Sequence, residues 1–328
     1  MLRSQSLISA LIILFLSLFD QRAYASKIQY VNLNPLIGQL PYARYPSAAQ
    51  KQSKMTFETS VAISNYFRQS TVDQTTYDVD GETSLIRETL TYRTGTLSLG
   101  LSLQYQAHRS GYLDDPIYEF HDVFGMPQNG REQSTNNQLN WNITKNGETY
   151  KRIDRSYGLG DTMLFVEMRP TSFISDAVSL SFNLPTGDTS KQTGGLASSI
   201  NLSFATQGAS IELDNAFLPR IQTSYGYNVS YLRYKSMIDE FSPNPFVGGA
   251  YGSLDLIFTP TIALITNIDI NTPYFNDEVR ELGWTSIALS SALSFDVSRH
   301  NIYIGFSEDI RPSTTPDFSL FFGLTTNL

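Results

Sequence analysis

Residues 97–108 read Leu-Ser-Leu-Gly-Leu-Ser-Leu-Gln-Tyr-Gln-Ala-His. Every odd-numbered residue in this stretch is apolar, and every even-numbered residue is small or polar. Because successive side chains of a β-strand point to opposite faces, this alternation predicts a strand with one apolar and one polar face. The stretch is also about as long as a tilted strand must be to cross a bilayer. Similar segments recur as far as Leu328, so the sequence predicts a transmembrane β-barrel.

The strands are expected to run in alternating directions, with short turns at the periplasmic end and longer loops outside the cell. Short connectors follow the second, eighth and tenth strands, at residues 94–96, 259–260 and 297–299. A segment near 209–216 would upset these directions if it were a strand, so we expect a long periplasmic connection there. The fold class is then all-β, a single closed antiparallel barrel of about twelve strands within residues 55–328. The strands are expected near residues 55–67, 84–94, 97–108, 161–169, 177–185, 196–206, 222–234, 247–258, 261–271, 284–296, 300–309 and 317–328.

The N-terminus has the features of an export signal. Arg3 precedes an apolar run at residues 7–19, and Ala23-Tyr24-Ala25 is a small-x-small cleavage site. We expect cleavage after Ala25 and residence in a bacterial outer membrane; an uncleaved anchor is the alternative. Residues 26–54, rich in Pro and Tyr, are expected to form a periplasmic N-terminal segment or a plug.

Composition narrows the range of partners. The chain of 328 residues carries a formal charge of −8, which argues against nucleic-acid binding. Charged residues make up 16% of the chain, and it contains 19 Tyr and 20 Phe, as expected where many side chains face lipid. With no cysteine there is no disulfide, and no sequence motif calls for a cofactor. The expected partners are outer-membrane lipid, a small solute and the outer-membrane assembly machinery. The last is expected because residues 319–328 resemble the C-terminal signal that this machinery recognises.

The chain contains a set of short motifs rich in Gly, Asp and Pro. They are Asn34-Pro35-Leu36, Gly111-Tyr112-Leu113-Asp114, residues 119–127 (EFHDVFGMP), Asn129-Gly130-Arg131, residues 157–161 (YGLGD), residues 184–188 (LPTGD), Glu308-Asp309 and Pro316-Asp317-Phe318. These motifs resemble those of an uncharacterised proteobacterial family of predicted outer-membrane barrels. The resemblance covers nearly the whole mature chain and implies the same fold and location, without naming an activity. The Gly-Leu-Gly-Asp and Pro-Thr-Gly-Asp elements also occur in other outer-membrane barrels, including some linked to uptake of aromatic compounds, although turn chemistry alone favours Gly and Asp there.

Strand alternation also predicts which side chains face the lumen. Most are small and uncharged, and the larger ones carry charges of both signs, so we expect weak ion selectivity if the pore is open. Small residues would equally allow the barrel to narrow and close around a plug. The main lumen-lining candidates are Glu58, Arg87, Arg93, Ser98, Ser102, Gln104, Asp255, Asp269 and Asp296.

The segment from Arg109 to Tyr157 is expected to be a dominant extracellular loop, and loops of this length are often functional. Its candidate residues suit a recognition surface at the pore mouth or a calcium site, although their spacing matches no EF-hand; a solvated acidic loop is the plainer alternative. These candidates are Asp114, Asp115, Glu119, His121, Asp122 and Arg131.

The resulting functional hypothesis is a porin-like channel for passive or facilitated passage of a small, largely uncharged solute, and not an enzyme. A non-conducting surface or binding barrel is the first alternative. A lipid-modifying enzyme is the second, because His108 and Ser110 have a spacing that places both side chains on one strand face. Strand alternation places that face on the lumen side, whereas the outer-membrane phospholipase that this pair resembles acts at the lipid side.

Overall fold

The computed structural model describes residues 28, 31–34, 36–46, 53–125, 128, 130–170, 175–212, 219–234, 244–311 and 315–328. The export signal predicted at residues 1–25 lies outside these ranges. Among the described residues, no helix is both long and apolar enough to cross a membrane.

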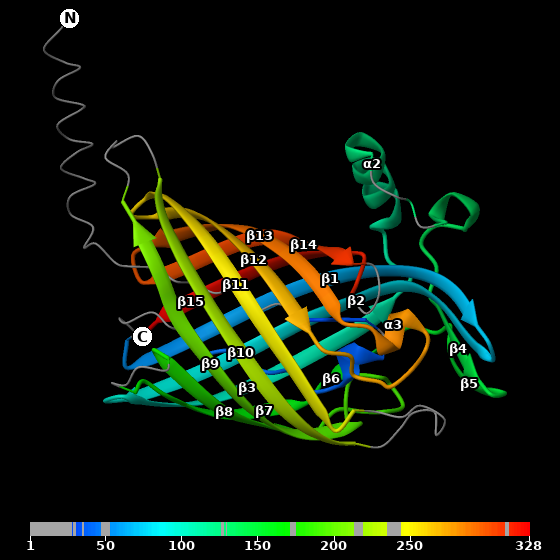
Figure 1. Cartoon of the computed structure of the whole chain (residues 1–328), viewed down its shortest axis with the longest axis horizontal. Helices are drawn as coiled ribbons and strands as arrows, with labels where there is room; N and C mark the ends of the chain where they lie inside the picture. The colour runs from blue at the N-terminus through cyan, green and yellow to red at the C-terminus, as the bar shows by residue number, and fades with distance from the viewer. Residues whose placement is uncertain are drawn as a thin grey trace, which may run out of the picture.

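Twelve antiparallel strands form a closed barrel, as the sequence predicted (Figure 1). The first and last strands close the ring, with registers from Thr56 opposite Asn327 to Asn65 opposite Phe318. Around the ring the strands are β1 (Met55–Val72), β2 (Thr75–Thr94), β3 (Leu97–Arg109), β7 (Thr162–Met168), β8 (Ala177–Leu184), β9 (Ala197–Ile211), β10 (Arg220–Tyr234), β11 (Phe246–Thr259), β12 (Ile262–Asn271), β13 (Ser286–Val297), β14 (His300–Arg311) and β15 (Phe318–Asn327).

The alternation seen in the sequence separates the two faces of the wall. In β3, Leu101 and Leu103 are 37% and 48% exposed, whereas Ser98 and Ser102 are 4% and 3% exposed. The apolar side chains therefore point outward, as lipid contact requires, and the small polar ones point into the barrel.

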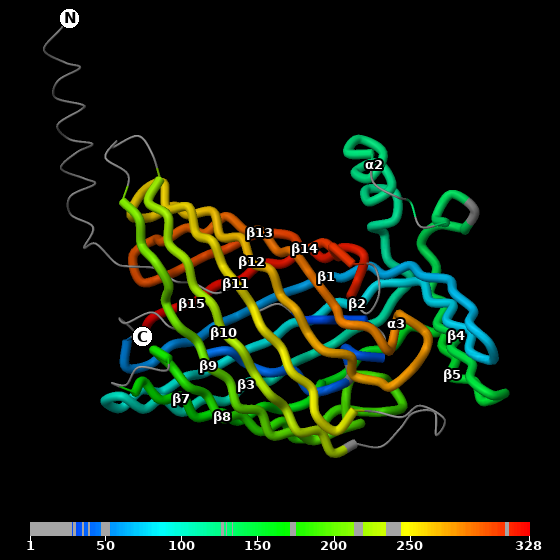
Figure 2. Tube along the Cα trace, viewed as in Figure 1, coloured from blue at the N-terminus to red at the C-terminus, as the bar shows by residue number. Residues whose placement is uncertain are grey.

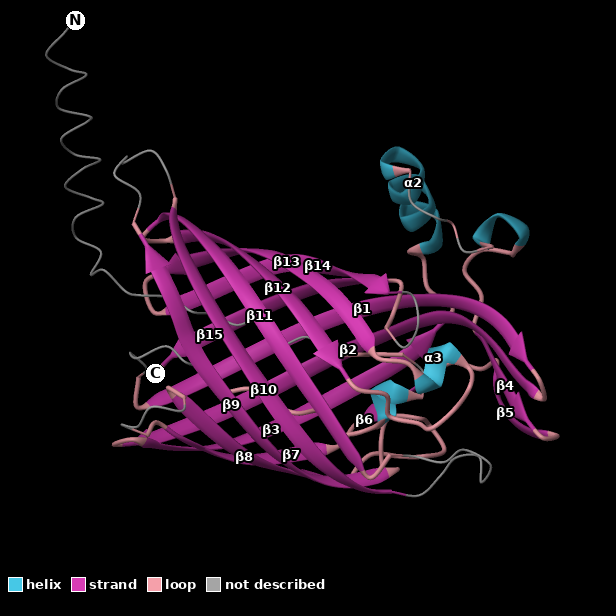
Figure 3. Cartoon of the chain, in the orientation of Figure 1, coloured by secondary structure: helices cyan, strands magenta, loops and turns pink. Residues whose placement is uncertain are grey.

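The two ends of the barrel differ. We call the end with the tight connections β2–β3, β11–β12 and β13–β14 the turn end; the C-terminal residue Leu328 lies there, with its N–H bonded to the carbonyl of Met55. We call the opposite end, which carries the helix α2 (Asp114–Phe124), the loop end (Figure 3).

Strands β1 and β2 are longer than the sequence pattern suggested. Residues 68–83 were expected to be a connection, but they continue the two strands into a tight turn at Asp73, which has a φ of +50°. The extension is rich in Thr, Val and Tyr, which favour strands. Its exposed edge is covered by β4 (Asn140–Lys145), which in turn pairs with β5 (Glu148–Arg152).

The segment from 109 to 157, expected to be a loop, contains regular structure. It forms α2, the short helix η2 (Arg131–Gln133), β4, β5 and the first half of β6 (Ser156–Leu159). Helix α2 ends at Gly125, whose φ of +66° is the left-handed cap conformation that glycine adopts without strain.

The connection predicted near 209–216 is wrong in its first part. Residues up to Ile211 belong to β9, where Ile211 pairs with Ile221 across a register shift in β10. Residues 213–218 lie outside the described ranges.

Candidate functional site

The described part of the N-terminal segment, residues 28, 31–34 and 36–46, lies inside the ring of strands (Figure 2). Leu36, Ile37 and Leu40, in and beside the short helix η1 (Ile37–Gln39), pack into a buried apolar cluster at the loop end. The cluster includes Tyr66 and Trp141 from the wall and its extension. Burial of these side chains anchors the segment by the hydrophobic effect.

Arg44 provides a polar anchor nearer the turn end. Its guanidinium lies 3.1 Å from Glu167 on β7 and 3.7 Å from Glu58 on β1, and it stacks over the ring of Phe165. Burial disfavours the charge on Arg44, but Glu167 and Glu58 outweigh that effect and raise its pKa. The two carboxylates thus compensate for placing a cation inside the barrel.

The neighbouring residues contact other parts of the wall. The hydroxyl of Tyr45 accepts a hydrogen bond from Asn228 on β10, and its ring meets Tyr251 on β11 edge-on at 4.8 Å. The carbonyl of Tyr42 accepts a hydrogen bond from Asn183 on β8. Strands β1 and β10 lie on opposite sides of the ring of twelve, so residues 42–45 cross the lumen.

The spaces beside this crossing are small. A cavity of about 40 Å³ is lined by Tyr42, Tyr45, Asn228 and Asp269, among others, and one of about 30 Å³ lies next to Ile28 and Tyr303. Since one water needs roughly 10–15 Å³ measured in this way, each cavity holds only a few waters.

The lumen candidates are distributed as follows. Arg87 is buried and stacks on the ring of Tyr42 at 3.9 Å from its centre. Asp255 accepts a hydrogen bond from Ser253, and Asp296 accepts one from Asn301 close to the turn end. Ser98, Ser102, Asp255 and Asp269 are buried, while Glu58, Arg93, Gln104 and Asp296 are partly exposed.

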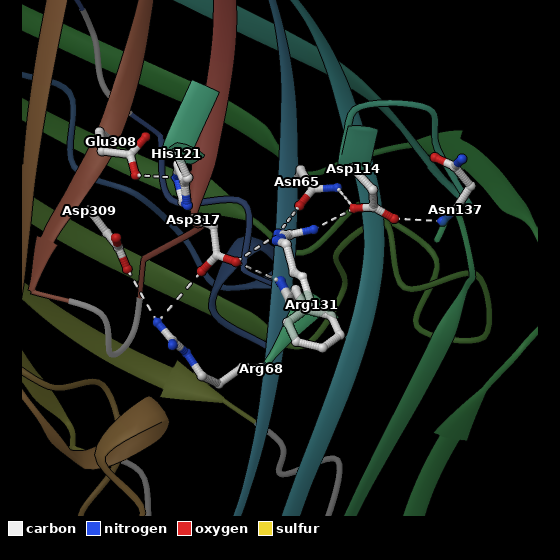
Figure 4. A network of polar contacts seen from close by, with 10 residues as sticks. Asn65, Arg68, Asp114, His121, Arg131, Asn137, Glu308, Asp309 and Asp317 are labelled. Atoms are coloured by element: carbon white, nitrogen blue, oxygen red, sulfur yellow. Dashed lines mark hydrogen bonds and ion pairs between the residues drawn. The ribbon is translucent and has the colours of Figure 1, made fainter. Parts of the chain in front are cut away.

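At the loop end, a second polar site is centred on Arg131, which is 5% exposed (Figure 4). Its guanidinium donates to Asp114 at the start of α2, to Asn65 on β1, and to Asp317 just before β15. Asn65 also donates to Asp114. One cation therefore joins the loop region to the first and last strands at the seam where the barrel closes.

The same site extends toward β14. Arg68 on β1 lies 3.5 Å from both Asp309 and Asp317. His121 in α2 lies 3.4 Å from Glu308. These contacts hold α2 against the wall at two points, Asp114 and His121.

Of the six loop candidates, the structure brings Asp114, His121 and Arg131 into this network. Asp115 accepts a hydrogen bond from Asn136, and Asp115, Glu119 and Asp122 are exposed on α2. Within the described ranges, no group of three or more His, Cys, Asp or Glu side chains is arranged to hold a metal ion.

Sequence reasoning missed Arg44 and Asn65 as site residues. Arg44 did carry a signal, because it is the only charged residue between Lys27 and Lys51. Asn65 carried none, since a polar residue on the inner face of a strand is common.

His108 and Ser110 do not form the arrangement that a hydrolase needs. Both ring nitrogens of His108 are engaged, one with the hydroxyl of Thr83 and the other with the carbonyl of Gln192, each at 2.8 Å. Its ring also packs edge-on against Trp141. No ring nitrogen remains to activate Ser110.

The Gly-Leu-Gly-Asp and Pro-Thr-Gly-Asp motifs meet in space. Asp161 accepts hydrogen bonds from the N–H groups of Gly187 and Gly195. A side chain on Gly194 would come within 2.5 Å of this carboxylate, so the close approach requires glycine. Burial outweighs these hydrogen bonds and raises the pKa of Asp161 to about 6.

These features define a transmembrane β-barrel with an occupied lumen and an ordered loop end. The chain belongs to the family described as "Protein of unknown function (DUF3187)", whose model matches residues 6–328. This agrees with the resemblance noted in the sequence.

No protein in a search of curated proteins matches the chain. Among solved structures, CdiB from Acinetobacter baumannii is 11% identical with a TM-score of 0.37, over 85% of this chain and 61% of CdiB. The NanC porin is 6% identical with a TM-score of 0.42, over 83% of this chain and all of NanC. The Ralstonia pickettii toluene transporter TbuX is 7% identical with a TM-score of 0.40, over 85% of this chain and 90% of TbuX. Values this low carry no information about what the chain binds or transports.

Proposed function

We propose that this protein is an outer-membrane channel for small, largely uncharged solutes, held closed by its own N-terminal segment. The observation that carries the proposal is the crossing of the lumen at residues 42–45, with Arg44 bound to β1 and β7 and Tyr45 bound to β10. A barrel that served only as a structural support would need no peptide segment across its polar lumen. Leaving the lumen exposes the charged anchor of Arg44 to water, where its ion pairs weaken.

The class of solute follows from the inner face of the wall. Ser181, Asn201 and Ser290 are among many small uncharged side chains that point inward. The charged ones near the crossing have both signs, Glu58 and Glu167 against Arg87, and a mixed set gives weak ion selectivity. A neutral solute with hydrogen-bonding groups suits this lining.

Location and assembly belong to the same proposal. Outward leucines such as Leu99 and Leu101 suit outer-membrane lipid, and the export signal with cleavage after Ala25 would deliver the chain there. The final strand, β15, ends one residue before the C-terminus and suits recognition by the assembly machinery of that membrane. N-terminal sequencing of the exported protein tests the cleavage position.

The test of channel function is conductance of the refolded chain in a planar bilayer, after heat-modifiable migration on a gel has shown that the barrel is folded. We expect rare openings for the unaltered protein and much more frequent ones for Arg44→Glu, which places three carboxylates together. Arg44→Lys keeps the charge and serves as the matched control. Swelling of liposomes in neutral sugars, compared with charged solutes of similar size, then tests the solute class.

Folded Arg44→Glu protein that neither conducts nor swells liposomes would overturn the channel. That outcome would favour the second candidate, a non-conducting surface or binding barrel. The observation in favour of this candidate is the ordered loop end, where Arg131 joins Asp114, Asn65 and Asp317. Binding to the loop end would then be the activity to measure.

A further inference from the structure

Helix α2 has three distinct faces. Successive residues of a helix are about 100° apart, so residues three, four and seven positions apart share a side. Asp114, Ile117 and His121 form the buried face, and Asp115, Glu119 and Asp122 form an exposed acidic face. Phe120, Val123 and Phe124 form an apolar face, on which Val123 is 77% and Phe124 is 63% exposed. The centres of the apolar and acidic faces lie about 130° apart around the helix, and Val123 and Glu119, four positions apart, lie at the border between the two faces.

The apolar face continues the outer surface of the barrel. The ring of Phe120 lies 4.7 Å from that of Phe124 and 6.0 Å from that of Phe318 on β15, measured between ring centres. Phe318 stacks in turn on Phe306 of β14. Phe306 shares its strand face with Ile304, which is 58% exposed on the outside of the wall. An unbroken row of aromatic rings therefore leads from the outer face of β14 and β15 onto α2.

The position of α2 relative to the wall also bears on what its apolar face contacts. Figure 3 shows α2 standing out sideways at the loop end, with its axis across the long axis of the barrel. The contacts of Arg131 with Asp114 and of His121 with Glu308 fix both ends of this arrangement. A helix held in this direction beside a transmembrane wall lies along the membrane surface.

We propose that the apolar face of α2 lies in the lipid at the outer surface of the membrane, with its acidic face in water. Amphipathic helices of this kind bury the apolar side at the boundary between headgroups and acyl chains. Phe is among the side chains that form the apolar face of such interfacial helices, as Phe120 and Phe124 do here. The helix then anchors the loop end to the lipid, whether or not the lumen conducts.

The chain contains no cysteine, so single cysteines can be introduced and labelled without background. The experiment uses the full chain in liposomes with an environment-sensitive fluorophore at Val123→Cys, at Asp122→Cys on the acidic face, and at Leu103→Cys on the outer face of β3. Quenching by spin-labelled lipid and by aqueous iodide is measured for each. All three native side chains are exposed, so the substitutions remove little packing.

We expect lipid-borne quenching at position 123 to approach that at 103 and to exceed that at 122 severalfold, with iodide showing the reverse order. Equal quenching at 123 and 122 by both agents would overturn the proposal. Protection of position 123 from both agents would also overturn it, because a protein partner or a second copy would then cover this face. Neither result depends on conductance, so the outcome is separate from the test of the channel.

Discussion

Arg44 and Tyr45 are adjacent in the chain, yet they hold opposite sides of the barrel. The guanidinium of Arg44 lies 3.7 Å from Glu58 on β1, and the hydroxyl of Tyr45 accepts a hydrogen bond from Asn228 on β10, six strands away around the ring of twelve. Together the two contacts hold the short segment of residues 42–45 across the lumen.

Exchange of the charges at Arg44 and Glu167 tests whether the ion pair itself keeps residues 42–45 in place across the lumen. Arg44→Glu and Glu167→Arg each leave like charges in contact, so either change alone should raise the fraction of time that the channel is open. The double variant restores an attractive pair and should close the channel again. Single-channel recording of the four proteins gives the coupling directly.

Opening that stays as rare in the two single variants as in the unaltered protein would show that the ion pair is not what holds the segment. The apolar anchor at Leu36 and Ile37 would then carry the closure.

Arg131 should stabilise the loop end more than any exposed charge near it. Arg131→Ala leaves the buried Asp114 without its cation and leaves Asp317 with Arg68 alone, and removing one partner of a buried ion pair typically costs about 3–5 kcal/mol. We expect rapid proteolysis within residues 109–155 in that variant, while the barrel itself stays folded on a gel. Glu132→Ala, one residue away and exposed, is the control and should be cleaved as slowly as the unaltered protein.

Periodicity predicted the barrel well because each strand has one lipid-facing side and one inward side. Leu99, Leu101 and Leu103 mark the outer face of β3 without any knowledge of its neighbours. Periodicity failed at residues 68–83 because these parts of β1 and β2 extend beyond the membrane wall. There a strand no longer has one lipid-facing side and one lumen-facing side. It also missed α2, because Asp114 and His121 lie in a segment expected to be a loop, although their spacing of seven positions places them on one side of a helix.

The sites depended on contacts that no local pattern encodes. Arg131 meets Asp317 across 186 positions of sequence, and Arg44 meets Glu167 across 123. Asp317 lies near Arg131 because the last strand pairs with the first, and Glu167 lies near Arg44 because the N-terminal segment lies inside the barrel. Sequence alone indicated which residues carry charge, and the fold decided which of them meet.

Leu101→Arg should impair assembly because it places a cation in lipid. The expected cost is about 2–4 kcal/mol if Leu101 lies near the middle of the bilayer. Thr96→Arg introduces the same side chain at the exposed turn between β2 and β3, where the cost falls to roughly 0–1 kcal/mol. Refolding yield in liposomes, read from heat-modifiable migration, compares the two. Equal yields would place Leu101 away from lipid and contradict the outward assignment of its strand face.

Asp161 should make the barrel less stable as the pH rises from about 4 to about 6. Its pKa is raised to about 6 in the folded protein, above the ordinary value of 3.8. Between these values the folded state binds more protons than the unfolded state, so the free energy of unfolding falls with increasing pH across this window. The stabilisation is complete below about pH 4 and is lost as the pH passes the folded value.

Asp161→Asn removes the titration while its amide oxygen can still accept the N–H groups of Gly187 and Gly195. The urea midpoint of the variant, measured from pH 3.5 to pH 7, should therefore vary less than that of the unaltered protein, and the two curves should diverge between pH 4 and pH 6. Curves that stay parallel through this range would mean that Asp161 titrates alike in both states. The contact between the two glycine-rich motifs would then be a neutral turn, and the pH dependence of the barrel would arise from other carboxylates.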